Sequence, residues 1–284
     1  MTITRRSFRK VVDRVRTVPA LPEVVARVVR LINDPNTQAD QVNQLVGKDA
    51  AMAAQMLHLV NSVYYGLAEP VNGLDQAIRI LGFKTVRSIA LSLSTINRFQ
   101  QQSSTFDMKA FWAHSAVCAS LCRLIAAKSK VCDPELAFTL GLLKDIGKVI
   151  LVDNATEETR QIIAIARKRG IDFTSACREV LDTDDAEIGA WLTGRWQLEA
   201  KLVEAIRHQH HLARTSEPKL VAICQLAEYL CGLKQIRTSG SCDEPRLNPA
   251  VWTHLGLDPS ALLEFLAVIS DEAENARQVL PLAG

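Results

Sequence analysis

The longest interval without a chain-breaking residue is the feature that most constrains the fold of this chain. Fifty-one consecutive residues, from Phe83 to Asp133, contain neither glycine nor proline. A β-sandwich or β-barrel requires turn residues roughly every 8–12 positions. Glycine and proline together make up only 23 of the 284 residues, about 8% against a usual ~12%. The sequence therefore excludes an all-β fold and predicts an all-α fold.

Hydrophobic residues recur with helical spacing along most of the chain, and no segment alternates as a strand does. Gly47 is expected to end a short early helix, and Asp49 to cap the next one. Gly82 is expected to join two helices tightly, and residues 236–249 are expected to form a surface loop. The predicted helices cover residues 23–32, 42–46, 50–61, 75–81, 83–99, 107–130, 134–152, 156–169, 173–181, 185–194, 199–210, 217–233, 249–255 and 259–280.

The net charge of +2 gives no global argument for binding to nucleic acid or to a membrane surface. The charge is uneven, because residues 1–18 carry six basic groups against the single acid Asp13. This basic arm could bind an anion or a partner, but a solvated leading segment is the favoured interpretation. Neither a secretory signal nor a window approaching ~18 apolar residues is found, so we expect a cytoplasmic protein.

The seven cysteines are odd in number and form no Cys-x-x-Cys pair. Most of them lie in apolar helical patterns, which favours buried free thiols in a reducing compartment. Cys118 and Cys122 are one helical turn apart, and adjacent core positions are a better interpretation of that spacing than a metal site. The cysteines are Cys118, Cys122, Cys132, Cys177, Cys224, Cys231 and Cys242.

Histidines and acidic residues are scattered through the second half of the chain. Such residues on neighbouring helices can build a metal site inside a bundle. Spacing alone favours ordinary surface or hydrogen-bonded side chains, and adjacent residues such as His210 and His211 would diverge by about 100° on a helix. The set comprises His114, Asp145, Asp185, Glu187, His208, His210, His211 and Glu228.

Residues 141–148 (GLLKDIGK) resemble the central motif of the HD superfamily of metal-dependent phosphohydrolases. Residues 111–115 (FWAHS) resemble the helix that carries the first histidine ligand of that family. Residues 185–192 (DAEIGAWL) and 205–211 (AIRHQHH) follow the order of its HD-GYP branch, and residues 222–228 (AICQLAE) resemble the helix of the last acidic ligand.

Three motifs of the first half resemble the HDOD domain, the HD-related output domain of bacterial signalling proteins. They are residues 21–24 (LPEV), 57–66 (LHLVNSVYYG) and 77–82 (AIRILG). The resemblance implies one all-helical HDOD domain over residues 15–235, in which an N-terminal subdomain (15–103) packs on an HD-like subdomain (104–235). A basic arm (1–14) would precede this domain, and a loop with C-terminal helices (236–284) would pack on it.

The resemblance assigns seven residues to a vestigial HD pocket: His114, Lys144, Asp145, Asp185, His210, His211 and Glu228. Lys144 stands where the family has a histidine, and a protonated lysine has no lone pair for a metal. Asp185 stands where the HD-GYP branch has another histidine, and Glu228 replaces the final aspartate. The resemblance therefore implies that catalysis, metal and cofactor have been lost.

The direction of the Lys144 side chain decides what the pocket contains. If Lys144 points inward, its ammonium replaces the charge of the missing cation and balances Asp145 and Glu228, since an unpaired buried carboxylate is costly. In the alternative, Lys144 turns to solvent and Asp145 bonds the backbone or His114. An ammonium far beyond ~4 Å from every carboxylate would contradict charge replacement.

Two further groups have open interpretations. Asn61, Ser62, Tyr64 and Tyr65 form a candidate interaction surface, although a helix C-terminal cap with half-buried tyrosines is favoured. The basic residues after the turn at Gly82 are Lys84, Arg87 and Arg98, and a solvated face is favoured over a helix-turn-helix.

The leading functional prediction is a non-catalytic signalling module that binds a protein partner and takes a small regulatory ligand in the vestigial pocket. The alternatives are a phosphohydrolase of nucleotides or cyclic dinucleotides with an altered ligand set, and a nucleic-acid-binding regulator.

Overall fold

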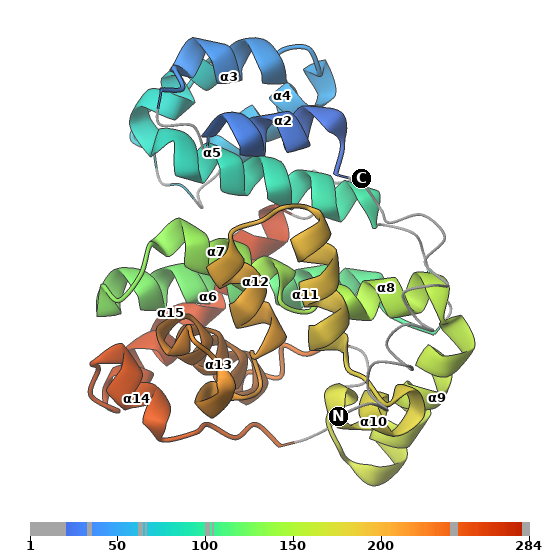
Figure 1. Ribbon diagram of the computed structural model, residues 1–284. Coiled ribbons are helices and arrows are strands. Elements are labelled where there is room, and N and C mark those ends of the chain that lie inside the picture. The colour runs from blue at the N-terminus through green and yellow to red at the C-terminus, as the bar shows by residue number, and fades with distance from the viewer. Residues whose placement is uncertain are drawn as a thin grey trace. The chain divides into compact units, whose positions relative to one another are not determined.

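The computed structural model describes residues 21–32, 36–61, 65, 67–99, 103, 105–238 and 244–279. The described residues form helices, turns and loops without a β-strand, which confirms the all-α prediction (Figure 1). The predicted basic arm lies outside them. The described residues divide into a larger unit, which lies within residues 103–269, and a smaller unit, which comprises described residues of 21–99 together with 270–279.

In the smaller unit, three short helices pack on one long helix. These are α2 (Glu23–Ile32), α3 (Ala39–Val46) and α4 (Ala50–Val60), which contact α5 (Leu74–Arg98). Gly82 has φ +82° and ψ 164° within α5, so the predicted tight junction is a kink inside one element. A residue with a Cβ would be strained at this positive φ.

The larger unit contains the HD-like motifs. Its elements are α6 (Met108–Ser129), α7 (Pro134–Leu143), α8 (Ile146–Asn154), α9 (Thr156–Arg169), α10 (Phe173–Leu181), α11 (Asp185–Arg195), α12 (Ala200–Arg207), the 3₁₀ turn η1 (Leu212–Arg214), α13 (Pro218–Leu233), α14 (Ala250–Leu255) and the part of α15 (Ala261–Val279) up to Ile269.

Helix α6 is the core of the larger unit and packs against α7 and α13. Contrary to the sequence expectation, α6 is long and apolar enough to cross a membrane by length and composition. However, 72% of its apolar window is buried inside the protein, so this apolar character is accounted for by core packing. Five of the cysteines are buried free thiols, as predicted; they are Cys118, Cys122, Cys177, Cys224 and Cys231.

The structure corrects the prediction of one continuous helix over residues 134–152. Helix α7 ends at Leu143 and α8 begins at Ile146, so that Lys144 and Asp145 occupy the corner between them. Two glycines allow the neighbouring helices to approach. A Cβ on Gly141 would lie 2.6 Å from Ala119 Cα of α6, and one on Gly147 would lie 1.9 Å from the Asp185 carbonyl oxygen of α11.

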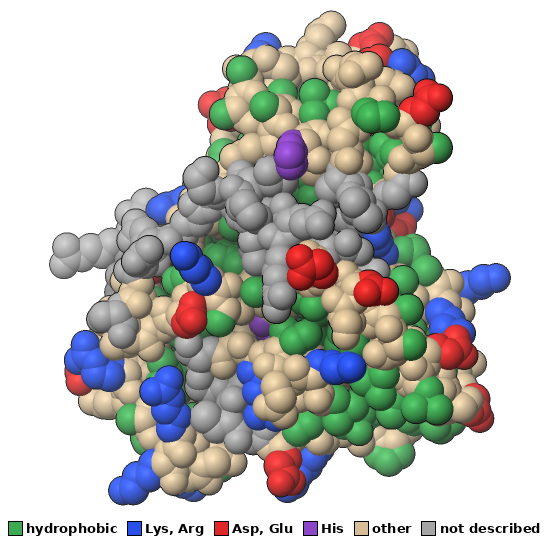
Figure 2. All heavy atoms as spheres, turned by 180° about the vertical axis from the view of Figure 1, so that it is seen from behind, with side chains coloured by type: hydrophobic (Ala, Val, Ile, Leu, Met, Phe, Trp, Pro, Cys, Tyr) green, Lys and Arg blue, Asp and Glu red, His purple; other side chains and the backbone are tan. Residues whose placement is uncertain are grey.

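Charged side chains of both signs are interspersed on the face shown in Figure 2, in agreement with the small net charge. Helix α9 illustrates the local pattern, with Glu157 and Glu158 in its first turn and Arg167, Lys168 and Arg169 in its last turn. That order complements the helix dipole.

Candidate functional site

Lys144 and Asp145 are held inside the larger unit at the α7–α8 corner, where each residue is at most 2% exposed. The Lys144 carbonyl accepts a hydrogen bond from Gln209 Nε2 at 2.7 Å. Gln225 Nε2 of α13 donates in turn to the Gln209 carbonyl at 3.0 Å. The corner is therefore tied to the segment after α12 and to α13 through two amide side chains.

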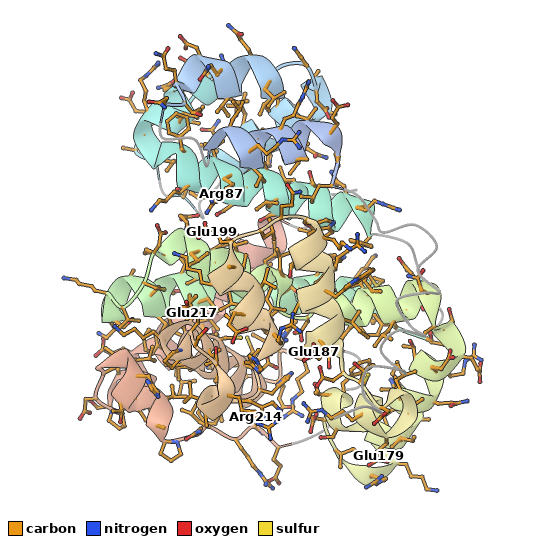
Figure 3. All side chains as sticks on the ribbon, viewed as in Figure 1. Arg87, Glu179, Glu187, Glu199, Arg214 and Glu217 are labelled. Atoms are coloured by element: carbon orange, nitrogen blue, oxygen red, sulfur yellow. The ribbon has the colours of Figure 1, made fainter. Side chains whose placement is uncertain are left out.

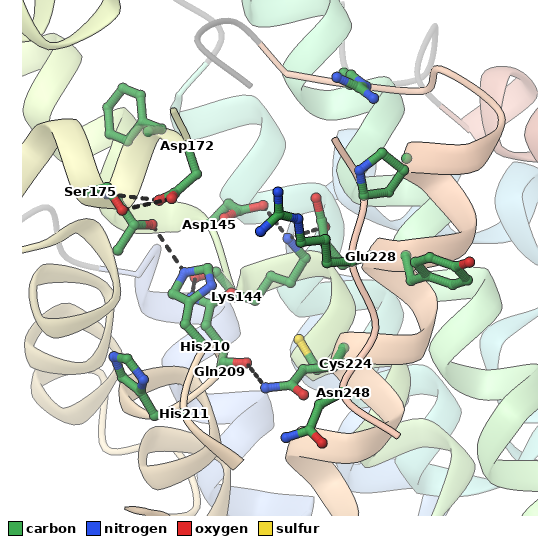
Figure 4. A pocket seen from close by; sticks show the side chains of 18 of the residues that line it. Lys144, Asp145, Asp172, Ser175, Gln209, His210, His211, Cys224, Glu228 and Asn248 are labelled. Atoms are coloured by element: carbon green, nitrogen blue, oxygen red, sulfur yellow. Dashed lines mark hydrogen bonds and ion pairs between the residues drawn. The ribbon is translucent and has the colours of Figure 1, made fainter. Parts of the chain in front are cut away.

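The Lys144 side chain points into the pocket, as charge replacement requires (Figure 4). Its ammonium contacts Asp145 Oδ2 and lies 2.7 Å from Glu228 Oε2. A second ammonium, that of Lys148 one turn further along α8, lies 2.9 Å from Asp145 Oδ1. Asp145 is thus shared by two buried lysines.

His114 of α6 completes this cluster. Its Nδ1 donates to the Ile236 carbonyl at 2.9 Å, because a carbonyl oxygen only accepts. Its Nε2 lies 3.1 Å from Glu228 Oε2 and 3.6 Å from Asp145 Oδ2. Both ring nitrogens therefore face acceptors, which favours the imidazolium ion. Burial by itself lowers the pKa of His114, but Glu228 and Asp145 raise it to about 10.

Mutual pairing keeps the cluster ionised. Burial raises the pKa of Asp145, but Lys144 and Lys148 outweigh burial and hold that pKa well below its usual range. Burial also raises the pKa of Glu228, but Lys144 and His114 outweigh burial and lower it. The Oε2 atom of Glu228 is buried, although 45% of the side chain is exposed. Burial lowers the pKa of Lys144, yet Asp145 and Glu228 raise it well above its ordinary value.

The same cluster contains a group of side chains that could hold a metal ion. Ligand atoms of His114, Cys118 and Glu228 lie within 4.8 Å of one another. However, the Lys144 ammonium lies 2.7 Å from Glu228 Oε2, the carboxylate of this group, and also contacts the neighbouring Asp145. The ammonium itself offers no lone pair. The residues present therefore do not fit a divalent metal ion while Lys144 keeps this position.

Asp185 and His210 lie at a second place, beside the Lys144 cluster. Thr174 Oγ1 donates to Asp185 Oδ1 at 2.8 Å and lies 3.1 Å from His210 Nε2. Asp185 is fully buried, and its Oδ2 atom has no hydrogen-bond partner among the described residues. Burial raises the pKa of Asp185 despite the nearby Lys148.

His210 and His211 are not helical, and both contact α10: His210 Nε2 lies near Thr174 and His211 Nε2 near Arg178. Helix α12 ends at Arg207 rather than at the predicted residue 210. His211 Nε2 lies 2.9 Å from Arg178 Nη2, and Arg178 also donates two hydrogen bonds to Asp184 Oδ2. Burial and Arg178 lower the pKa of His211, so its Nε2 lone pair accepts from the guanidinium.

The two remaining candidates of the acidic and histidine set form surface ion pairs. Glu187 of α11, labelled in Figure 3, pairs with Arg207. His208 lies 3.5 Å from Glu204. Both pairs are partly exposed, which matches the favoured sequence interpretation for ordinary surface residues.

One cavity of about 430 Å³ joins the Lys144 cluster to His210 and His211 (Figure 4). Its floor contains Lys144, Asp145 and Glu228. One wall comes from α10 and the segment after α12, and the opposite wall comes from α13 and residues 245–248. The residues that line it are Lys144, Asp145, Lys148, Asp172, Phe173, Thr174, Ser175, Arg178, Gln209, His210, His211, Cys224, Gln225, Glu228, Tyr229, Gly232, Arg237, Pro245, Arg246 and Asn248.

Several residues of this site are not predicted by the sequence motifs. Lys148 stands in the quoted motif, but the direction of its side chain depends on the break between α7 and α8, which the sequence does not show. Thr174, Arg178 and Arg246 belong to no motif, and only the fold brings them to the cavity.

The second candidate surface lies in the smaller unit. Asn61 caps α4, and its side-chain amide exchanges two hydrogen bonds of 2.8 Å with the Val71 backbone. Tyr65 is half-buried, while Ser62 and Tyr64 lie outside the described residues. The Asn61 amide therefore closes a loop. Arg87, expected on a solvated face, is only 9% exposed, because it lies on the buried side of α5.

Comparison with known proteins identifies the family of this chain. The model of the HDOD domain family matches residues 18–212. An uncharacterized protein of Treponema pallidum (strain Nichols) is 24% identical over 220 residues, which cover 76% of this chain and 42% of that protein. The chain thus spans about two fifths of the length of this curated relative.

Two solved structures are similar over nearly the whole chain. One is an HDOD domain protein of unknown function from Geobacter sulfurreducens, with 24% identity, a TM-score of 0.81, and coverage of 94% of this chain and 93% of that one. The other, from Shewanella amazonensis SB2B, is named provisionally as a phosphohydrolase. It has 25% identity, a TM-score of 0.77, and coverage of 95% of this chain and 97% of that one.

The all-helical fold and the family match together define the class of protein. Within that class, this chain belongs to the HDOD domain family.

Proposed function

We propose that this chain is a non-catalytic module of bacterial signal transduction. It acts by presenting a helical surface to a signalling protein, and a small ligand in the vestigial HD pocket regulates it. The observation that carries the proposal is the contact of the Lys144 ammonium with Asp145 and Glu228. Membership of the HDOD family, which serves as an output domain in signalling proteins, supplies the role in signalling.

The chemistry of the Lys144 cluster argues against hydrolysis. Hydrolysis by an HD-type site requires a cation that polarises the phosphate and generates hydroxide. An ammonium neutralises the carboxylates electrostatically, but it has no vacant coordination position for water. His114 adds a second cation beside Glu228, which further disfavours the approach of a metal ion.

Metal content and turnover test the proposal directly. The freshly purified chain should contain far less than one equivalent of iron, manganese or zinc by mass spectrometry. It should also leave bis(p-nitrophenyl) phosphate intact in the presence of Mn²⁺. Stoichiometric metal together with turnover would identify the alternative, a metal-dependent phosphohydrolase with an altered ligand set.

Replacing the lysine tests whether Lys144 alone excludes the metal. The Lys144→His variant should gain affinity for Mn²⁺ or Zn²⁺ by calorimetry, because an imidazole restores a lone pair beside His114 and Asp145. Lys219→His, at an exposed position of α13, should gain none and serves as the control. Equal metal affinity of Lys144→His and wild type would contradict the role given to Lys144.

The nucleic-acid alternative depends on the basic arm and on the residues after Gly82. It requires an affinity for DNA or RNA that falls steeply with salt, and we expect no such binding. The burial of Arg87 weakens the basic footprint on which this alternative depends.

A further inference from the structure

The floor of the cavity holds charges that are already compensated. Asp145 pairs with Lys144 and Lys148, and Glu228 pairs with Lys144 and His114. A ligand that enters the cavity therefore meets no unpaired carboxylate on the floor. The charge available for recognition lies at the rim.

The rim carries the guanidinium groups of Arg178 and Arg246. The carboxylate among the rim residues is that of Asp172. It already accepts the Ser175 backbone N–H at 2.7 Å and the Ser175 hydroxyl at 2.6 Å as the cap of α10. The rim is therefore basic.

Hydrogen bonds to neighbouring side chains hold the Arg178 guanidinium in place before any ligand binds. Its Nε and Nη2 donate to Asp184 Oδ2 at 2.9 and 2.7 Å, and Nη2 also contacts His211. Its Nη1 makes no hydrogen bond to any described residue, so this nitrogen retains two donors in a fixed orientation. A guanidinium held in this manner loses little side-chain entropy when it binds an oxyanion.

Arg246 faces the same opening from the other wall. Pro245 fixes its segment against α13, since a Cβ on Gly232 would lie 2.7 Å from Pro245 Cβ. Arg246 is exposed and makes no ion pair with the described residues. Asn248 on the same segment accepts the Ala250 backbone N–H on its Oδ1 at 3.0 Å, which leaves its Nδ2 as a further donor at the cavity.

We propose that the cavity binds a phosphorylated small molecule without metal, with the phosphate on Arg178 and Arg246 and the uncharged remainder against Tyr229 and Phe173. Guanidinium groups pair bidentately with phosphate oxygens. Two such groups around one opening fit the two negative charges of a phosphate monoester better than the single charge of a carboxylate ligand. The volume of about 430 Å³ falls in the usual range of small-molecule sites. This inference rests on the proposed function, because a floor filled by Lys144 allows binding without hydrolysis.

Calorimetry in the presence of EDTA tests the inference on the full chain, with inorganic phosphate, adenosine 5′-monophosphate and adenosine as probes. The monophosphate should bind, and adenosine should bind at least about tenfold more weakly, because the phosphate supplies the contact with the rim. Arg246→Gln should weaken monophosphate binding by about tenfold or more. Arg160→Gln, in an exposed pair on α9, should leave the affinity unchanged.

Two results would overturn the inference: neither phosphate nor the monophosphate binds, or Arg246→Gln and Arg178→Gln both bind as wild type does. These failures differ from failure of the proposed function, which shows as metal-dependent turnover of a phosphodiester. Binding in EDTA that depends on Arg246, without turnover when Mn²⁺ is present, supports both.

Discussion

The Asp145 carboxylate is the anion on which the buried cluster depends. It contacts Lys144 and lies 2.9 Å from Lys148, and His114 Nε2 lies 3.6 Å away. Asp145→Asn removes this charge while keeping the size of the side chain. Lys144 then retains Glu228, whereas Lys148 loses the carboxylate with which it forms its ion pair in the described structure.

The expected loss follows from the burial of the lysine that is left. The Lys148 side chain is 8% exposed, and removal of one partner of a buried pair typically costs about 3–5 kcal/mol. Because Lys144 remains paired, we expect Asp145→Asn to lower the free energy of unfolding by about 3–5 kcal/mol and not by twice that amount. Adding Lys148→Met removes the unpaired ammonium and should recover about 1–3 kcal/mol.

Urea unfolding followed by tryptophan fluorescence measures this loss in the relevant unit. All four tryptophans, Trp112, Trp191, Trp196 and Trp252, belong to the larger unit. Asp182→Asn changes an exposed aspartate of the same unit and should shift stability by less than about 0.5 kcal/mol. The reasoning is refuted if Asp145→Asn lowers the free energy of unfolding by less than about 1 kcal/mol, or if adding Lys148→Met lowers it further instead of restoring part of it.

Two further predictions concern the same unit. The pKa of His114 is raised from 6.5 to about 10, so the contribution of this histidine to stability is complete below about pH 6.5 and declines as pH rises toward 10. The free energy of unfolding should therefore fall between about pH 6.5 and 8, and His114→Gln should flatten that fall. A parallel decline in the variant and the wild type would contradict the assignment. Gly147→Ala places a Cβ 1.9 Å from the Asp185 carbonyl oxygen. Because α8 and α11 must separate to admit it, the free energy of unfolding measured in urea should fall by about 3 kcal/mol or more. An unfolding midpoint equal to that of the wild type would show that the two helices are not in close contact.

The helical class could be predicted from the sequence, because it depends on local patterns of hydrophobicity, and the family could be recognised from its motifs. The corner at Lys144 and Asp145 could not, since apolar residues continue with helical spacing on both sides of it. That corner sets the phase of α8 and thereby turns Lys148 toward Asp145. The position of Lys148 therefore stays hidden until the break is known.

The rim of the cavity was beyond sequence reasoning for a different reason. Arg178 and Arg246 are 68 positions apart, and each is an ordinary exposed arginine in its own segment. They meet at one opening only because α10 and the segment after α13 form opposite walls. Tertiary packing, which no local pattern encodes, creates this part of the site.

The cation at the centre of the Lys144 cluster is part of the polypeptide itself. A site that holds a free metal ion gains stability in proportion to the logarithm of the metal concentration, so its occupancy reports the supply of that metal. A lysine in contact with Asp145 and Glu228 is present at a fixed stoichiometry of one in every molecule. The state of this unit should therefore be indifferent to iron or manganese starvation and to chelators, which would let it respond to its own signal under any metal supply.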